Sequence, residues 1–105
     1  MNLIATTPEP PYYAVIFTSL HSDNVEGYAE TADRMVELAA QQPGFLGIES
    51  AREELGITIS YWTDLESIRQ WKAQAEHREA QKMGIEKWYS NYMTRISLVE
   101  RDYAK

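Results

Sequence analysis

Four segments of the chain carry the apolar patterns of β-strands, at residues 12–18, 45–50, 57–62 and 92–99. In the first segment, β-branched and aromatic residues fill both alternating sets of positions, which predicts a strand covered on both faces. The second and third are separated by a short polar stretch that ends in Gly56, so we expect them to pair as an antiparallel hairpin. In the fourth, the alternation extends towards Tyr103.

Two other segments have apolar residues at the spacing of an amphipathic helix. The first follows the cap residue Asp23 and should end near residue 42, because the Pro43–Gly44 pair cannot continue a helix. The second opens with a capping box over residues 63–66. Its predicted buried stripe consists of Leu65, Ile68, Trp71 and Ala75. After residues 76–78 the pattern changes, and the apolar spacing then predicts a short further helix or turn, broken near Gly84.

The order strand, helix, strand, strand, helix, strand is that of the ferredoxin-like βαββαβ arrangement. It predicts an α+β domain in which two helices cover one face of a four-stranded antiparallel sheet. The other face would expose a larger apolar patch than soluble monomers usually tolerate, so we expect a homodimer. Three of the four prolines lie within residues 1–11, which predicts a flexible arm there and a single domain over residues 12–105.

Composition narrows the classes of function. The 105 residues include no cysteine, which excludes disulfides, thiolate metal sites and a cysteine nucleophile in this chain. A formal net charge of -6 disfavours nucleic acid as a partner and leaves a small molecule or a protein. The sequence has neither the pattern of a signal peptide nor an apolar run that could span a membrane, so we expect a cytoplasmic protein with no membrane partner.

A series of short motifs then points to a known family. The motifs are, in order, YWTDLESI at 61–68, WK at 71–72, EHREAQ at 76–81, WYSNY at 88–92 and VERDY at 99–103. Together they resemble the antibiotic biosynthesis monooxygenase (ABM) domain, over about residues 12–103. The resemblance implies a dimeric α+β barrel, in which two ferredoxin-like sheets pack face to face. It also implies a pocket between the sheet and the helices of each subunit.

The activity that the resemblance implies is that of a cofactor-independent monooxygenase acting on a small aromatic or quinol-type substrate. In such a reaction a base removes an acidic proton, and the electron-rich anion reduces dioxygen while the protein orients and desolvates it. The same fold also serves haem-degrading enzymes, lactone isomerases and members with no shown activity, so the fold alone does not settle the chemistry. The competing hypothesis is a non-catalytic dimer that binds a small hydrophobic molecule or serves in stress physiology.

Two residues are candidates for the catalytic groups. His77 is the candidate base, since imidazole is well suited to move a proton near neutral pH. The alternative is that His77 ends the second helix and packs locally at the carbonyl end of that helix. Arg95 lies among apolar residues of the last strand, where a guanidinium needs an anionic substrate oxygen or an interface carboxylate. His21 precedes the first helix in a polar turn, and we expect it on the surface.

Aromatic residues in the second half of the chain are candidates for binding the substrate. Flat rings can wall a site for a small hydrophobic or aromatic molecule. The candidates are Trp62, Trp71, Trp88 and Tyr92. For Trp71 the alternative of an ordinary core residue is stronger, because it lies on the buried stripe of the second helix.

Haem binding or haem degradation is a minor alternative. Haem-degrading relatives carry a histidine ligand on a helix, but the matching position here holds Gln81, and amides are poor haem ligands. Their first-strand asparagine is also missing, because the chain has none between Tyr12 and Asn24. Two separated histidines are not a metal-ligand set, and no phosphate loop or dinucleotide fingerprint occurs. We therefore expect no cofactor and no metal.

Overall fold

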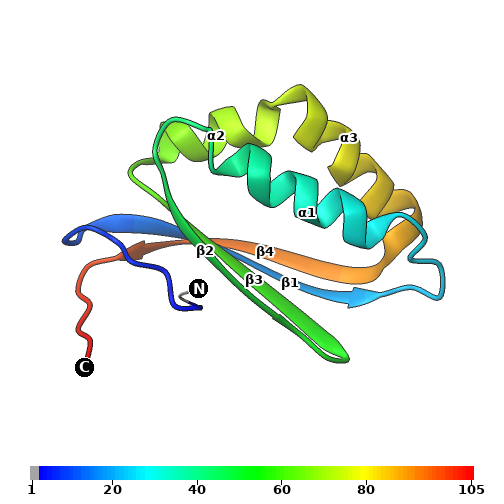
Figure 1. Cartoon of the computed structure of the whole chain (residues 1–105), viewed down its shortest axis with the longest axis horizontal. Helices are drawn as coiled ribbons and strands as arrows, with labels where there is room; N and C mark the ends of the chain where they lie inside the picture. Colours follow the sequence, from blue (N-terminus) through cyan, green and yellow to red (C-terminus); the bar gives the residue numbers. More distant parts are fainter. Residues whose placement is uncertain (1–2) are drawn as a thin grey trace.

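The computed structural model describes residues 3–105, except for the side chain of Ala75. The elements along the chain are β1 (Tyr12–His21), α1 (Tyr28–Ala39), β2 (Phe45–Arg52), β3 (Leu55–Trp62), α2 (Leu65–Ala73), α3 (Ala75–Met83), a π-helical turn (Gly84–Trp88) and β4 (Tyr89–Val99). Residues 1–2 of the predicted arm, and the predicted burial of the Ala75 side chain, lie outside the described residues. Figure 1 shows the helices in one layer above the sheet.

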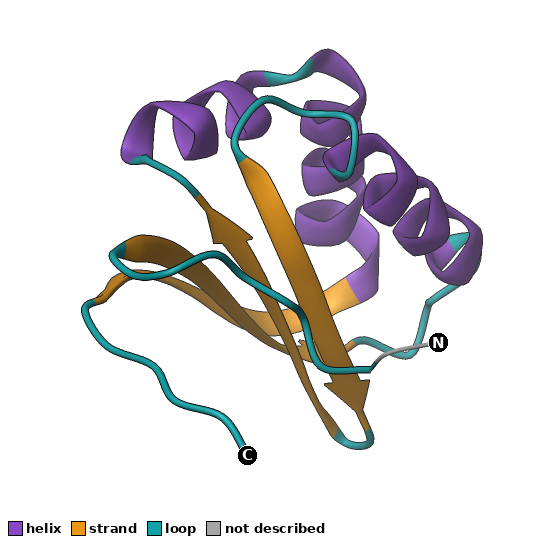
Figure 2. Cartoon of the chain, turned by 60° about the vertical axis from the view of Figure 1, so that its left-hand side comes forward, coloured by secondary structure: helices purple, strands orange, loops and turns teal. Residues whose placement is uncertain are grey.

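The four strands form one antiparallel sheet in the order β2-β3-β1-β4. The connection through α1 leads from β1 to β2 and passes over β3, whereas the connection through α2 and α3 leads from β3 to β4 and passes over β1. Figure 2 shows the helices on one face of the sheet. The prediction of an α+β, ferredoxin-like fold with a β2–β3 hairpin is confirmed, with three helices in place of two.

The two faces of the sheet follow from the strand register, because directly opposed residues point to the same face. Phe17 and Trp62 lie on the face that the helices cover, which we call the helix side. Ile16 and its partner Ile59 lie on the other face, which we call the open side. The large apolar side chains that remain exposed on the open side are Leu20, Leu55, Ile57 and Met93. Both faces of the sheet are thus apolar, as the alternation in β1 predicts.

Helix α1 begins at Tyr28, five residues after the predicted cap residue Asp23. Gly27, with a left-handed φ of 81°, precedes the helix, and no side chain caps its first turn. The hydroxyl of Ser22 instead accepts the Asn24 N–H at 3.1 Å and donates to the carbonyl oxygen of Lys87 at 2.5 Å. The prediction of a cap at Asp23 was wrong because these local hydrogen bonds hold the segment as a loop.

The helical region that follows β3 is divided at Gln74. Asp64 caps α2 by accepting the Ser67 N–H at 2.7 Å, one residue later than the predicted capping box begins. Gln74 has an extended backbone, and its side chain caps α3 by accepting the His77 N–H at 2.8 Å. The expected break after residues 76–78 was therefore wrong, and His77 lies in the first turn of α3. The break at Gln74 is marked in the sequence by neither a glycine nor a proline.

Two strands begin earlier than the pattern predicts. β3 starts at Leu55, so only Glu53 and Glu54 lie between the strands of the hairpin. β4 starts at Tyr89 directly after the π-helical turn and ends at Val99. Tyr103 is fully exposed beyond the strand, so the predicted extension of the alternation does not form.

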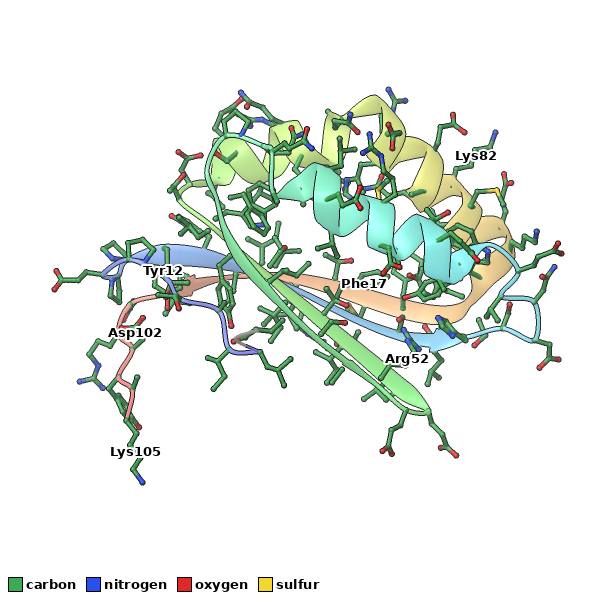
Figure 3. All side chains as sticks on the ribbon, viewed as in Figure 1. Tyr12, Phe17, Arg52, Lys82, Asp102 and Lys105 are labelled. Atoms are coloured by element: carbon green, nitrogen blue, oxygen red, sulfur yellow. The ribbon has the colours of Figure 1, made fainter. Side chains whose placement is uncertain are left out.

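Segments near both termini of the described chain are hydrogen-bonded to residues on the open side of the sheet. The Ala5 N–H donates to a carboxylate oxygen of Glu49 at 3.0 Å, and the Tyr61 hydroxyl donates to the other oxygen at 2.6 Å. Burial, together with Glu49, raises the pKa of Tyr61. The buried Tyr12 donates its hydroxyl to Asp102 at 2.5 Å. Figure 3 shows Tyr12 and Asp102 at the opposite end of the sheet from Arg52.

Candidate functional site

Three of the predicted site residues lie together at one end of the helix side. The ring of Trp71 stacks between Trp62, at 6.2 Å between centroids, and His77, at 4.0 Å and an interplanar angle of 10°. Trp62 is completely buried, and its indole N–H donates to Ser60 at 2.9 Å. We call Trp62, Trp71 and His77 the Trp62 column. The column fills the space between β3 and the junction of α2 and α3.

His77 is held as a neutral imidazole. Its Nδ1 lies 2.8 Å from the carbonyl oxygen of Trp71, and because a carbonyl can only accept, Nδ1 carries the proton. Burial lowers the pKa of His77, and the hydrogen bond to Trp71 opposes this only in part. Its Nε2 therefore keeps a lone pair that can accept a proton near neutral pH. The position of the ring against the carbonyl end of α2 agrees with the local packing in the alternative interpretation, although His77 itself belongs to α3.

A second histidine lies at the other end of the helix side. The ring of His21 meets Tyr28 of α1 at 4.3 Å between centroids and stacks near Tyr89 of β4 at 5.8 Å. Its Nε2 is buried and has no hydrogen-bond partner among the described residues. Burial, with a contribution from Arg52, lowers the pKa of His21. The expectation that His21 lies on the surface was wrong, because β1 continues through this residue and turns it under α1.

Arg52 brings a positive charge to the same end of the sheet. Its guanidinium donates to the side chain of the buried Ser19 and, at 3.4 Å, to its carbonyl oxygen. It lies 5.9 Å from the centre of the Tyr28 ring. Gly56, opposite Arg52 in the hairpin, gives it space, since a Cβ there would collide with the guanidinium. No described carboxylate forms an ion pair with Arg52.

We call His21, Tyr28, Arg52 and Tyr89 the His21 cluster. Burial and the neighbouring Tyr28 hydroxyl raise the pKa of Tyr89, so this phenol stays protonated. From Tyr89 the aromatic contacts continue to Phe17, at 5.2 Å, and from Phe17 to Tyr92, at 5.7 Å. Tyr92 is 44% exposed although it lies on the helix side. The helices thus leave this part of β4 open next to the cluster.

The other two predicted site residues lie apart from both groups or serve the packing. Trp88 is buried, and its indole N–H donates to the carbonyl oxygen of Glu26 at 2.8 Å, which fixes the π-helical turn to the loop before α1. Its ring reaches the His21 cluster only through Tyr28, at 5.6 Å. Arg95 lies opposite Ile16 on the open side and has no ion pair among the described residues. The structure therefore does not bring Arg95 to either histidine.

A groove of about 580 Å³ runs along α1, α3 and the π-helical turn, away from both histidines. The ion pair between Arg34 of α1 and Glu76 of α3, with 2.7 Å between nitrogen and oxygen, joins its two walls. Within residues 3–105, no three His, Cys, Asp or Glu residues are grouped closely enough to hold a metal ion. None of the described helices has the length and apolar character needed to span a membrane.

Comparison with known proteins adds to this picture. Residues 11–83 match the family model described as antibiotic biosynthesis monooxygenase. The uncharacterised protein YqjZ of Bacillus subtilis (strain 168) is 52% identical over 103 residues, which cover 96% of this chain and 90% of that protein.

Solved structures have the same fold at low sequence identity. SnoaB from Streptomyces nogalater, described as a cofactor-independent oxygenase, is 16% identical with a TM-score of 0.69, over 90% of this chain and 97% of that one. Rv0793 from Mycobacterium tuberculosis is 11% identical with a TM-score of 0.75, over 90% and 99% of the two chains. At these identities the likeness shows the fold alone.

Proposed function

This chain belongs to the antibiotic biosynthesis monooxygenase family, and we propose that it oxygenates a small aromatic or quinol-type substrate without a cofactor. The position of its two histidines against aromatic rings carries the proposal. Each histidine lies against aromatic rings on the helix side, and each keeps a buried or half-buried ring nitrogen without a strong partner. A neutral imidazole beside flat rings is what the removal of a proton from an aromatic substrate requires.

The reaction needs no electron source other than the substrate. The histidine takes a proton from an acidic hydroxyl or ring methylene, and the resulting anion passes one electron to dioxygen. The substrate radical and superoxide then join through a new C–O bond, and the peroxide takes up a proton. Loss of water from this hydroperoxide breaks the O–O bond and leaves a carbonyl, so one oxygen atom enters the substrate and the other leaves as water. Orientation and exclusion of water are the contributions of the protein.

His77 remains a proposed base, with Trp62 and Trp71 beside it as proposed residues of a substrate site at that end of the helix side. Trp88 and Tyr92 remain proposed residues of a substrate site at the other end. His21 joins them as a second candidate base, because its Nε2 is buried without a described partner. Arg95, on the open side, is better suited to an ion pair with a partner subunit than to a substrate oxygen.

Oxygen uptake tests the proposal. We expect purified protein to consume dioxygen above the uncatalysed rate with at least one member of a panel of dihydroxyaromatics, anthrones and quinols. Loss of the base should lower the rate about a hundredfold or more. His77→Ala and His21→Ala identify the base, His77→Phe keeps the ring stacking if the alanine variant unfolds, and Arg95→Gln is the control. Absence of uptake across the panel contradicts the proposal and favours the non-catalytic binding protein.

We also propose that a second copy of the chain covers the open side. The exposed apolar residues there, Leu20, Leu55, Ile57 and Met93, lie over neighbouring strands and form a patch that a monomer would leave in water. Membership of a family in which dimers are common supports this occupant. Sedimentation should give about twice the chain mass of 12.1 kDa, and a monomer at low micromolar concentration contradicts it.

A further inference from the structure

We infer that His21 and Arg52 form the polar end of the substrate site and bind an acidic oxygen of a planar aromatic molecule, whose ring lies against Phe17 and Tyr92. The oxygen belongs to a phenol, an enol or a carboxylic acid. The inference rests on the proposed oxygenation, since it names the chemistry of the substrate that this reaction would use.

The charge of Arg52 has no anionic partner among the described residues. The guanidinium is half-buried, and its hydrogen bonds to Ser19 are to neutral oxygens. A guanidinium shielded from water is stabilised by a carboxylate or another anion, yet no described acidic side chain forms an ion pair with it. Its remaining N–H groups form the fork that binds two oxygens of an anionic group at once. A substrate anion therefore supplies the charge that the chain itself does not.

The free nitrogen of His21 requires a hydrogen-bond partner. Buried polar atoms almost always have one, and Nε2 of His21 has none among the described residues. In the tautomer that carries its proton on Nδ1, Nε2 of His21 accepts a hydrogen bond from an aromatic hydroxyl. The nearby charge of Arg52 favours the deprotonated form of that hydroxyl, so the two residues act in the same direction on the substrate.

The aromatic contacts give the site its shape. Tyr28 and Tyr89 enclose His21, while Phe17 and Tyr92 continue the rings along the sheet. Phe17 is only half-buried, and Tyr92 is 44% exposed on the helix side. Their rings are thus accessible to a flat molecule, in contrast to Trp62, which is completely buried. Figure 3 shows Phe17 between Tyr12 at one end of the sheet and Arg52 at the other.

Arg95 provides a matched control within the same chain. It has the same side chain and also no ion pair among the described residues, but it lies on the open side opposite Ile16, away from the helices. Because Arg95 lies on the side that a second copy is proposed to cover, a loss of affinity caused only by weaker pairing of the two copies would appear at Arg95. A built site involves Arg52 alone.

Binding without oxygen tests the inference separately from catalysis. The probes are 1-hydroxy-2-naphthoate and its uncharged methyl ester, titrated under nitrogen by calorimetry. We expect wild type to bind the acid more tightly than the ester, and Arg52→Gln to weaken the acid about tenfold or more while changing the ester by about twofold at most. Arg95→Gln should leave both affinities unchanged. Equal affinities for acid and ester, or equal losses in the two arginine variants, would overturn the inference.

The two histidines allow a second measurement, which does not depend on the folding of an arginine variant. In ¹⁵N spectra of the imidazoles, saturation with 1-hydroxy-2-naphthoate should shift the His21 resonances and leave those of His77 in place, with His77→Phe identifying the signals. A shift at His77 alone, or at neither, overturns the inference. Anaerobic binding with the expected pattern but no oxygen uptake removes the monooxygenase proposal and keeps this site. Oxygen uptake from uncharged substrates alone, with no preference for the acid, keeps the monooxygenase proposal and removes this site.

Discussion

The two ends of the helix side each hold a histidine among aromatic rings, but only the Trp62 end is built around a completely buried ring. In the Trp62 column, His77 is hydrogen-bonded through Nδ1 and stacked on Trp71, and the rings cover a completely buried Trp62. In the His21 cluster, Nε2 of His21 has no described partner, and the neighbouring Arg52 has no described counterion. The first end has its polar groups paired within the fold. At the second end, the imidazole of His21 and the guanidinium of Arg52 lack such partners among the described residues.

The two histidines differ in how their charged neighbours are paired. His77 lies between Glu76 and Arg78, yet Glu76 points away to Arg34 of α1. His21 is followed by serine, and Arg52 reaches the same end from β2, so the cluster forms only through the fold. Each prediction below sets one end against the other.

The largest difference is expected when an aromatic ring is removed from each end. Trp62→Ala should lower the free energy of unfolding by about 3–5 kcal/mol, because a completely buried indole leaves a cavity. Tyr92→Ala, at the other end, should cost about 1 kcal/mol or less, since this ring is already 44% exposed. Urea unfolding followed by far-UV circular dichroism measures both values. Similar losses would break this distinction between the two ends.

An intermediate difference is expected at two glycines with left-handed backbone. Gly44, beside the Trp62 column, has φ of 83°, and a Cβ there would collide with Ser67. Gly44→Ala should cost about 1–3 kcal/mol, because backbone strain and the collision act together. Gly27, before α1, has φ of 81°, but a Cβ there would meet only the Trp88 ring at 3.9 Å. Gly27→Ala should therefore cost less, about 1 kcal/mol, in thermal unfolding, and the reverse order would show that the loop before α1 is the tighter of the two.

The smallest effect is expected from pH. The pKa values of His77 and His21 are both lowered from 6.5 by burial, so between the lowered pKa and 6.5 the unfolded chain binds more protons than the folded one. The free energy of unfolding should therefore rise with pH in this window and reach its full value above it. His77→Phe and His21→Phe should each flatten the rise. Urea unfolding at several pH values measures the slopes, and an unchanged slope in a variant means that its histidine titrates alike in both states.

The fold could be predicted largely from the sequence because the local patterns agree with the global arrangement. The alternation in β1 and the hairpin that ends at Gly56 indicate a sheet with two apolar faces, and the register confirms it. The ends of the helices were harder to predict. Gln74 divides α2 from α3 through an extended backbone and a side-chain cap, a role that glutamine seldom has and that no spacing of apolar residues reveals.

The candidate site could be predicted only in part. The stacking of Trp71 on His77 was not predicted, because it depends on the break at Gln74 that puts the two rings on different helices. His21 was missed because the polar turn after it suggested that the strand had ended, although continued alternation from Phe17 and Ser19 would have put it on their face. Arg52 was missed because the space for its guanidinium depends on Gly56 in the neighbouring strand. The pairing of the two strands was predicted, but the pattern started the second strand only at residue 57, so the register that puts Arg52 opposite Gly56 was not.

The anchoring of both chain ends has a practical consequence for the experiments above. Ala5 is held at Glu49 and Asp102 at Tyr12, and both contacts lie on the open side of the sheet, where Figure 1 shows the first and last segments of the chain running below the strands. A purification tag fused to either end would start beside this surface and compete with whatever covers it. Mass measurements on tagged protein would then underestimate self-association, so the tag should be cleaved before sedimentation.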